Sequence, residues 1–267
     1  MGYLKFPLEG RREKPRSTGL TMVIDKGVGL AALTDFLELN WPYVDFIKFS
    51  FGTSLIYPKK ILQEKIELIK SYDVTPYPGG TLFEIAVAQN KMEEYFRKLK
   101  KLGFPALEIS DGTIKLPVSL RKEAIRLARS AGFLVLTEVG KKDEAENLSL
   151  TETARILEAD LLAGADYIII EGRESGKGIF IYNLDGSINL ELFKGILAIA
   201  GERREQIIWE APLKKQQVFF IRELGINVNL GNILPEEVMA LEALRRGLRG
   251  DTFKMSLEGS SSTIKAT

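Results

Sequence analysis

The chain has 267 residues, of which 45% are hydrophobic and 27% are charged, as in an ordinary globular protein with one large core. Lysine and arginine number 37 against 36 acidic residues, which excludes the overall charge excess of proteins that bind nucleic acid or anionic membranes. No apolar run approaches the ~18 residues that cross a bilayer, and the N-terminal segment lacks the apolar core of a signal peptide. We therefore expect a cytoplasmic protein with neither nucleic acid nor membrane as partner.

Cysteine and histidine are both absent from the sequence. Without cysteine there is no disulfide, thiolate nucleophile or cysteine zinc site. Without histidine the chain lacks the commonest general base and the commonest ligand of transition metals. Acid–base chemistry must therefore rest on Lys, Asp, Glu or Tyr, and a bound metal would be a hard, magnesium-like cation with oxygen ligands.

Eight short segments rich in β-branched and aromatic residues alternate with helical patterns. The predicted strands are Leu20–Asp25, Val44–Phe49, Asp73–Pro76, Ala106–Ser110, Phe133–Glu138, Asp166–Glu171, Ile207–Glu210 and Ile226–Leu230. The predicted helices are Gly29–Leu39, Lys60–Lys70, Leu82–Leu102, Val118–Ala131, Thr151–Ala163, Leu190–Ile199, Gln216–Leu224 and Pro235–Arg246. Eight strand–helix repeats predict a single α/β domain, a (β/α)8 TIM barrel, with an open doubly wound sheet as the alternative fold.

The barrel is expected to span residues 19–250, between a basic N-terminal extension of residues 1–18 and a polar, serine-rich tail of residues 251–267. Neither extension carries a clear pattern of regular structure. Both are expected to be irregular, and to be mobile or to lie on the surface.

Successive strand residues point to opposite faces of the sheet. The parity of a position, that is, whether it falls on the same face as the large apolar residues or on the other face, therefore predicts where a charged side chain points. Lys48 alternates with the large apolar residues Ile47 and Phe49. The same test turns Glu108 and Glu171 away from the helix-packing face and into the barrel. The last positions of further predicted strands are also polar, namely Asp25, Glu138, Glu210 and Asn229.

Such a ring of polar groups at the carboxyl ends of the strands is typical of a barrel active site. The alternative is a ring of structural ion pairs that only closes the barrel mouth. Burying many acids without using them is costly, which favours a site.

Three loops combine glycine with cations or helix starts, as anion-binding loops do. EGRESGKG (171–178) offers Arg173, Ser175 and Lys177, although its spacing matches neither a Walker loop nor a dinucleotide fingerprint. NLGNILPEEV (229–238) places Gly231 and Asn232 just before a helix, where barrels often bind phosphate. PYPGGTLFE (76–84) presents Gly79 and Gly80 as a possible backbone nest. The alternatives are a lid without ligand and an ordinary strand-to-helix turn.

Two more loops pair an acid at a strand end with lysines just beyond it. TEVGKK (137–142) contains Glu138 and Lys141, and EAPLKKQQ (210–217) contains Glu210 and Lys214. Such lysines can bind oxyanions, and a desolvated lysine can act as an acid or base. Inert surface lysines would look the same in the sequence.

The motifs KFSFGTSLIYP (48–58), PYPGGTLFE (76–84), EISDGTI (108–114), LTEVGKK (136–142), IIEGRESGKG (169–178), WEAPLKKQQ (209–217) and NLGNI (229–233) together resemble phosphosulfolactate synthase. The resemblance runs from about Lys14 to Thr252. It implies a (β/α)8 barrel, associated with trimers, that adds sulfite to phosphoenolpyruvate with magnesium to give (2R)-phospho-3-sulfolactate. Both substrates are anions, in agreement with the cationic loops.

On this resemblance, negative charge develops on the substrate carboxylate as an enediolate, and a lysine protonates the neighbouring carbon. We expect Lys141, next to Glu138, to be this acid, with Lys48 as electrostatic support. Glu171, Glu210 and Glu108 are the expected magnesium ligands. The expected anion-binding residues are Arg173, Ser175, Lys177, Lys214, Gly79, Gly80, Gly231 and Asn232.

Two other functions fit parts of the sequence. A Schiff-base aldolase-type barrel would use Lys48 or Lys177 as a nucleophile on a phosphorylated substrate. A non-catalytic, stress-associated member of the family would keep the barrel without the reaction, although the intact charged ring argues against this.

Overall fold

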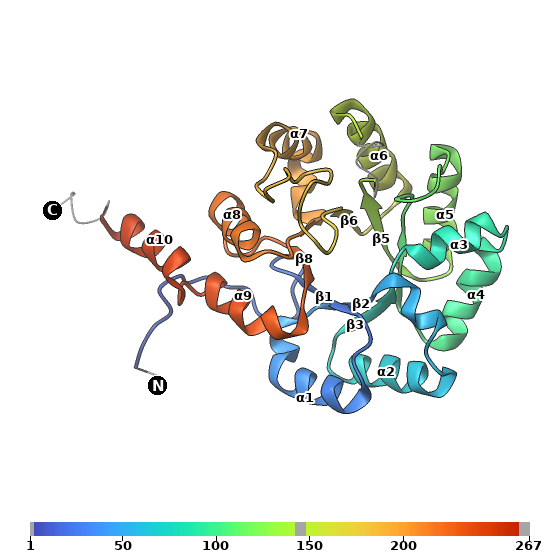
Figure 1. Cartoon of the computed structure of the whole chain (residues 1–267), viewed down its shortest axis with the longest axis horizontal. Coiled ribbons are helices and arrows are strands. Elements are labelled where there is room, and N and C mark those ends of the chain that lie inside the picture. The colour runs from blue at the N-terminus through green and yellow to red at the C-terminus, as the bar shows by residue number, and fades with distance from the viewer. Residues whose placement is uncertain (1–2, 142–147, 262–267) are drawn as a thin grey trace.

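The computed structural model describes residues 3–141 and 148–261 of the chain. Its parallel strands are β1 (Thr21–Asp25), β2 (Phe46–Phe49), β3 (Thr75–Pro78), β4 (Ala106–Ile109), β5 (Leu134–Val139), β6 (Tyr167–Ile170), β7 (Ile207–Glu210) and β8 (Leu230–Ile233). They form one sheet of eight strands in the order β3-β2-β1-β8-β7-β6-β5-β4. The sheet curls until β3 and β4 touch, so the predicted (β/α)8 barrel is confirmed (Figure 1).

Helices surround the sheet (Figure 1). They are α1 (Leu30–Asn40), α2 (Lys59–Ser71), α3 (Thr81–Ala88), α4 (Met92–Leu102), α5 (Val118–Ser130), α6 (Leu150–Ala163), α7 (Leu190–Ala200), α8 (Lys214–Leu224), α9 (Val238–Arg245) and α10 (Gly250–Ser261). Short 3₁₀ turns add η1 (Trp41–Tyr43), η2 (Ser50–Leu55), η4 (Gly201–Gln206) and η5 (Pro235–Glu237). None of the helices in the described ranges is long and apolar enough to cross a membrane.

Two apolar layers follow from the alternation of strand residues. Val23, Ile47 and Ile168 point outward and pack against the helices in the larger core. A smaller inner core fills the barrel below its mouth and consists of Leu20, Met22, Phe46, Tyr77, Ala106, Leu136, Ile169 and Ile208. The polar residues that follow on the inner face therefore sit on a packed floor rather than in a channel.

The barrel has one seam without a hydrogen-bonded ladder, between β3 and β4. In β3 the amides of Thr75 and of the following Gly79 donate to the β2 side. The alternate positions that face β4 are Pro76 and Pro78, which have no N–H to donate. The sequence TPYP thus accounts for the seam.

Three predicted elements differ from the structure. Strand three runs over Thr75–Pro78 and strand eight over Leu230–Ile233, both later than expected. The predicted helix Leu82–Leu102 is two helices, α3 and α4, because Asn90 adopts a positive φ of 55° between them.

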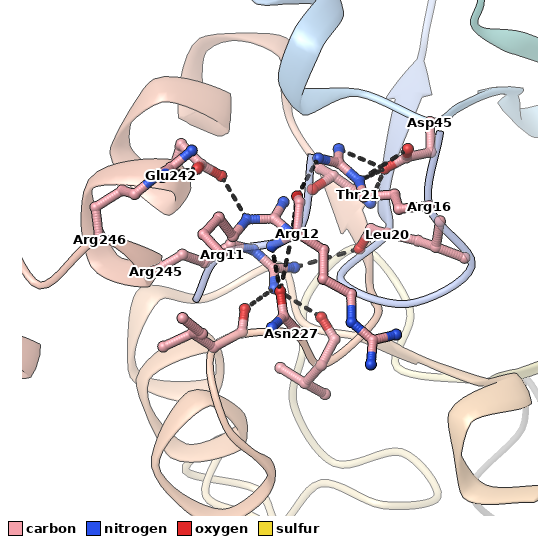
Figure 2. A network of polar contacts seen from close by, with 12 residues as sticks. Arg11, Arg12, Arg16, Leu20, Thr21, Asp45, Asn227, Glu242, Arg245 and Arg246 are labelled. Carbon is pink, nitrogen blue, oxygen red and sulfur yellow. Dashed lines mark hydrogen bonds and ion pairs between the residues drawn. The ribbon is translucent and has the colours of Figure 1, made fainter. Parts of the chain in front are cut away.

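The extensions also differ from expectation. The C-terminal segment is not irregular, because Gly250–Ser261 forms α10, which packs on α8 and α9 (Figure 1). The N-terminal segment has no helix or strand over residues 3–18. It is nevertheless anchored, since Arg11 and Arg16 make buried ion pairs with Glu242 and Asp45 (Figure 2).

Candidate active site

A cavity of about 690 Å³ opens at the carboxyl ends of the strands. Its floor and walls carry most of the charged residues that parity turned inward. It is lined by Ile24, Lys48, Ser50, Phe51, Gly79, Gly80, Thr81, Glu108, Thr113, Glu138, Glu171, Arg173, Glu174, Ser175, Glu210 and Asn232. The residues come from many different strands and loops, as barrel active sites require.

Lys48 lies at the centre of this cavity with carboxylates around it. Its ammonium is 2.9 Å from Glu108 Oε2, 2.9 Å from Glu138 Oε2 and 3.4 Å from Glu210 Oε1. Burial lowers the pKa of Lys48, but the three carboxylates raise it more, so its pKa lies well above the ordinary value. Lys48 is therefore a fixed positive charge at neutral pH.

Two of these partners, Glu138 and Glu210, also form a group of three carboxylates with Glu171. One carboxylate oxygen from each lies within 4.8 Å of the others, and all three residues are buried. Burial, and then Glu138 and Glu210, raise the pKa of Glu171 well above its ordinary value. Burial also raises the pKa of Glu210. Three buried carboxylates that repel one another at this spacing fit the ligand set of a hard divalent cation.

The predicted metal ligands were Glu171, Glu210 and Glu108. The structure groups the first two with Glu138 instead. Glu108 faces Lys48 from β4, and its other oxygen accepts a 2.7 Å hydrogen bond from the amide of Gly80.

Backbone amides hold two of the carboxylates in place. Glu210 Oε2 accepts from the amide of Gly172 at 2.9 Å, and Glu171 Oε1 accepts from the amide of Arg173 at 2.6 Å. Both amides begin the loop after β6. This loop therefore orients the carboxylates while its own side chains reach the cavity.

The glycine pair after β3 lines the cavity, but it is not a free anion nest. The amide of Gly79 donates to the carbonyl of Phe49, and the amide of Gly80 donates to Glu108. A Cβ on Gly80 would lie 2.2 Å from Ser110 Oγ. A Cβ on Gly79 would lie 3.1 Å from Lys48 Cε, so Gly79 packs closely on β2 and Gly80 on the end of β4, and neither amide is a free donor.

Three of the predicted anion-binding residues meet at the rim. Arg173, Ser175 and Asn232 all line the cavity, and Asn232 Nδ2 donates to the carbonyl of Arg173 at 3.2 Å. Arg173 and Asn232 both adopt positive φ, 52° and 55°. This hydrogen bond ties the loop after β6 to the end of β8, so one cation and two neutral donors converge on the same rim.

Other predicted residues lie away from this cavity. Lys177 is exposed, and Lys214 is paired with Asp251 at 3.1 Å. Gly231 is inside β8, where a Cβ would lie 2.3 Å from Met22 Cε. Gly231 therefore makes room for the inner core rather than for a ligand.

Two members of the predicted ring of strand ends face elsewhere. Asp25 points outward, pairs with Lys65 and accepts from the amides of Gly27 and Val28. Asn229 precedes β8 and binds the amide of Leu20 at the opposite end of the barrel, so its placement at a strand's carboxyl end was wrong.

Lys141 does not line the cavity. Its ammonium donates to the carboxylate of Asp111 at 3.1 Å and to the carbonyl of Ile114 at 3.2 Å. These residues belong to the loop after β4, and Thr113 of that loop does line the cavity. Lys141 is thus buried beside the site, and residue 142 of the same motif lies outside the described ranges.

The groups that support this region were not predicted from the sequence. Arg121 of α5 is fully buried and donates to Asp160, Asp111 and the carbonyl of Glu138. Glu84 of α3 accepts from the amides of Gly112, Thr113 and Ile114. Arg121 looks like a surface charge of an amphipathic helix and lies in no motif, whereas Glu84 ends the motif PYPGGTLFE, which does not reveal the loop that it binds. Ser50 and Thr113 also line the cavity. Ser50 lies on the same strand face as Lys48, and Thr113 lies in the motif EISDGTI, so both positions carried a signal in the sequence.

Comparison with solved structures shows the same architecture. 3-Hexulose-6-phosphate synthase from Salmonella typhimurium has a TM-score of 0.54 and 17% identity over 89% of this chain and 96% of its own. A phosphonopyruvate hydrolase complex with oxalate and Mg²⁺ has a TM-score of 0.52 and 15% identity over 86% of this chain and 80% of its own. At these identities the likeness concerns the fold alone.

Sequence comparison is far more specific. The family model for (2R)-phospho-3-sulfolactate synthase (ComA) matches residues 9–251. Phosphosulfolactate synthase of Methanothermobacter thermautotrophicus is 47% identical over 94% of this chain and 98% of its own, and that of Bacillus subtilis is 41% identical over 95% and 99%. The Arabidopsis thaliana protein HEAT-STRESS-ASSOCIATED 32 is 24% identical over 89% of each chain. The chain therefore belongs to the phosphosulfolactate synthase family of enzymes.

Proposed function

We propose that the protein catalyses the magnesium-dependent addition of sulfite to phosphoenolpyruvate, giving (2R)-phospho-3-sulfolactate. The observation that carries this proposal is the buried group of Glu138, Glu171 and Glu210 beside the fixed cation of Lys48. Together they form a site for a divalent cation at the base of a cavity large enough for a small phosphorylated acid.

Magnesium fits the donors that are present. The three residues offer only carboxylate oxygens, and burial, followed by repulsion from Glu138 and Glu210, raises the pKa of Glu171, as expected of a carboxylate group that lacks a counter-ion. A bound cation would supply positive charge beside the substrate carboxylate. Lys48 already balances Glu108 and part of the charge on Glu138 and Glu210, which leaves Glu171 the most dependent on the metal.

The rim of the cavity supports binding of the anionic groups of the substrates. Arg173 offers a guanidinium at the rim, with Ser175 and Asn232 as neutral donors. Lys177 lies in the same loop and Lys214 begins α8, directly after β7, so both stay candidates for drawing anions toward the site.

In this reaction the sulfur lone pair of sulfite attacks the methylene carbon, and the double-bond electrons move onto the carboxylate as an enediolate. The neighbouring carbon then takes a proton to complete the product. The chain has no histidine to supply it. We propose Lys141 as the donor, because it is buried against the loop after β4, whose Thr113 lines the cavity, whereas the strongly raised pKa of Lys48 makes that lysine a poor acid. To protonate the substrate, the ammonium of Lys141 would turn from Asp111 toward the cavity. Lys48 instead stays charged and stabilises the developing negative charge.

The Schiff-base alternative needs a neutral amine in the cavity. Lys48 is the lysine that lines it among the described residues, and its pKa is raised rather than lowered. Borohydride in the presence of substrate is therefore expected to leave the protein mass unchanged. A stable adduct on Lys48 or Lys177, together with full activity in chelator, would instead establish an aldolase-type reaction.

Mass detection of phosphosulfolactate tests the proposed reaction directly. We expect product from phosphoenolpyruvate and sulfite with magnesium, and loss of product in chelator that returning magnesium reverses. Lys141→Ala should lower kcat by about 10²–10⁴-fold, the range of general acid catalysis. Failure to form product or to bind magnesium and phosphoenolpyruvate by calorimetry would favour a non-catalytic family member.

The association with trimers implied by the resemblance gives a further proposal. We propose that the chain forms a homo-oligomer, and light scattering of the purified protein measures its mass directly.

A further inference from the structure

One buried carboxylate near the barrel mouth is not among the acids around Lys48. Glu84 lies in the first turn of α3, is 3% exposed and does not line the cavity. In the described part of the chain its hydrogen-bond donors are all neutral. A buried charge is costly unless it is well hydrogen-bonded, so the position of Glu84 needs a physical reason. That reason lies in the loop after β4 (residues 110–117), which joins β4 to α5.

Four donors of this loop converge on the two oxygens of Glu84. Oε1 accepts from the hydroxyl of Ser110 and from the amide of Gly112 at 3.1 Å. Oε2 accepts from the amides of Thr113 and Ile114 at 2.8 and 3.2 Å. A carboxylate has two acceptor oxygens, whereas the amide of a glutamine has only one. The three successive backbone amides therefore explain why a carboxylate is buried here.

The same loop also holds Lys141, the proposed proton donor. The ammonium of Lys141 donates to the carbonyl and the carboxylate of Asp111 and to the carbonyl of Ile114. Ile114 thus gives its amide to Glu84 and its carbonyl to Lys141. Thr113, the residue before it, lines the cavity. The loop therefore lies between Glu84 and Lys141 and forms part of the cavity wall.

The hydrogen bonds of Glu84 cross the seam of the barrel. Glu84 follows β3 and the loop follows β4, and these two strands have no hydrogen-bonded ladder between them. The amide of Gly80 donates to Glu108 across the same seam. The segment from Gly80 to Glu84 therefore binds Glu108, a partner of Lys48, and also the loop that holds Lys141. With the ladder missing, the place of this loop depends on side-chain contacts.

We propose that Glu84 is a positioning residue for the proton transfer, which fixes the loop after β4 while the ammonium of Lys141 turns toward the substrate. This inference rests on the proposed function of Lys141. When Lys141 leaves Asp111 and Ile114, the loop loses its contacts on that side and keeps its four hydrogen bonds to Glu84. The loop then offers Lys141 the same acceptors on its return and keeps Thr113 on the cavity wall.

Steady-state kinetics of Glu84→Gln tests the proposal. The amide keeps the size of the side chain but replaces one acceptor oxygen with a donor that faces the loop amides, so the loop should loosen. The value of kcat should fall at least about tenfold, while KM for phosphoenolpyruvate and the affinity for magnesium alone stay within about twofold. Glu84→Asp keeps both oxygens on a shorter side chain and should recover part of kcat. Glu94→Gln, at an exposed pair with Lys98 on α4, is the matched control and should leave kcat unchanged.

A double-mutant cycle with Lys141→Ala separates positioning from a general structural role. If Glu84 acts through Lys141, adding Glu84→Gln to Lys141→Ala should change the remaining kcat by less than about twofold. Mass detection of the product measures these low rates. Two kinetic results would overturn the proposal. One is an equal loss of kcat in both backgrounds, and the other is a raised KM with unchanged kcat, which would mean that the loop serves substrate binding alone.

Amine labelling reads the position of Lys141 without turnover. Lys141 is buried, and its acetylation by acetic anhydride, followed by peptide mass spectrometry, should be at least about threefold faster in Glu84→Gln than in wild type. The exposed Lys60 and Lys177 are internal references and should react at unchanged rates. If wild type forms no product, the proposed function fails, and this labelling still decides whether Glu84 holds the loop. An unchanged rate at Lys141 would reject the inference.

Thermal unfolding checks that Glu84→Gln folds. If it does not, Ser110→Ala serves in the same assays, because it removes one of the four donors and leaves the carboxylate and the three amides in place. Its effects on kcat and on the labelling of Lys141 should have the same direction and be smaller. Unchanged kcat and labelling in Ser110→Ala would equally reject the inference.

Discussion

The ammonium of Lys48 lies 2.9 Å from Glu138 Oε2, joining β2 to β5 across the mouth of the barrel. The same nitrogen also contacts Glu108 and Glu210. One lysine thus neutralises parts of three buried acids. This arrangement explains why the pKa of Lys48 is raised although the side chain is buried.

Replacing Lys48 with Met should destabilise the protein by about 3–5 kcal/mol at neutral pH, because it leaves buried carboxylates without their cation. The loss should shrink toward acidic pH, where those carboxylates take up protons. Urea unfolding at a series of pH values measures both effects. Lys60→Met, at an exposed pair with Glu64, should change stability by less than about 1 kcal/mol. Equal losses in the two variants would contradict the central role of Lys48.

Magnesium affinity should separate the two kinds of glutamate in the cavity. Glu138→Gln removes one of the three grouped carboxylates and should weaken binding at least about tenfold. Glu108→Gln removes a partner of Lys48 outside that group and should weaken it by a smaller factor. Calorimetry with magnesium alone makes the comparison without requiring turnover. The opposite order would restore Glu108 to the metal site.

Glu108 should give stability a specific pH dependence. Burial, and then repulsion by Glu138, raise its pKa from 4.5 to about 7 against the attraction of Lys48. The folded state therefore holds this proton more tightly than the unfolded chain, so its contribution to the unfolding free energy falls as pH rises from 4.5 to about 7.

Glu108→Gln cannot titrate, so the variant should gain stability relative to wild type as pH rises through that window. Denaturant unfolding of both proteins across the window gives the difference. Glu64→Gln, on the exposed side of α2, is the control and should show a constant difference from wild type. A constant difference for Glu108→Gln as well would count against the raised pKa.

Arg121 should be needed for both stability and activity. Its guanidinium joins Asp160 of α6 to Asp111 and to the carbonyl of Glu138. Arg121→Met should cost about 3–5 kcal/mol, the range for breaking a buried ion pair. Arg129→Met on the same helix, which breaks a partly exposed pair with Asp166, should cost less than about 1 kcal/mol.

Activity assays on the folded Arg121 variants complete this test. Because Asp111 also holds Lys141, Arg121→Met should reduce kcat more than it raises KM. Arg121→Lys keeps the charge and should recover part of kcat. An unchanged kcat in Arg121→Met would show that the contact is only structural.

Parity predicted the inward residues where the opposite face was clearly apolar. Lys48 alternates with Ile47 and Phe49, and both apolar residues are indeed in the outer core. It could not place Asp25, because Met22, Val23 and Ile24 are apolar on both faces of β1. A parallel strand that is buried on both faces has no alternation of apolar and polar residues, so parity cannot assign its side chains to a face.

Other features depend on contacts that sequence spacing does not contain. Strand eight was placed too early because its central Gly231 reads as a loop residue, although the crowded inner core requires glycine there. Glu138 lies with Glu171 and Glu210 because the neighbouring strands β5, β6 and β7 bring the three carboxylates together. Arg121 binds Asp160 of the next helix and Glu84 binds the amide of Thr113 in the loop after β4, so these partners emerge only from the closed barrel.

The prolines of β3 leave one pair of neighbouring strands, β3 and β4, without a ladder of backbone hydrogen bonds. Everywhere else around the ring, adjacent strands are joined by backbone hydrogen bonds, but at this place Pro76 and Pro78 contribute no donor. If β3 and β4 move apart at the mouth, no hydrogen bond donated by residue 76 or 78 is lost. Glu108 lies on β4 and Gly80 follows the prolines of β3. The 2.7 Å hydrogen bond from the Gly80 amide to Glu108 therefore connects the two strands at the place where the ladder is missing.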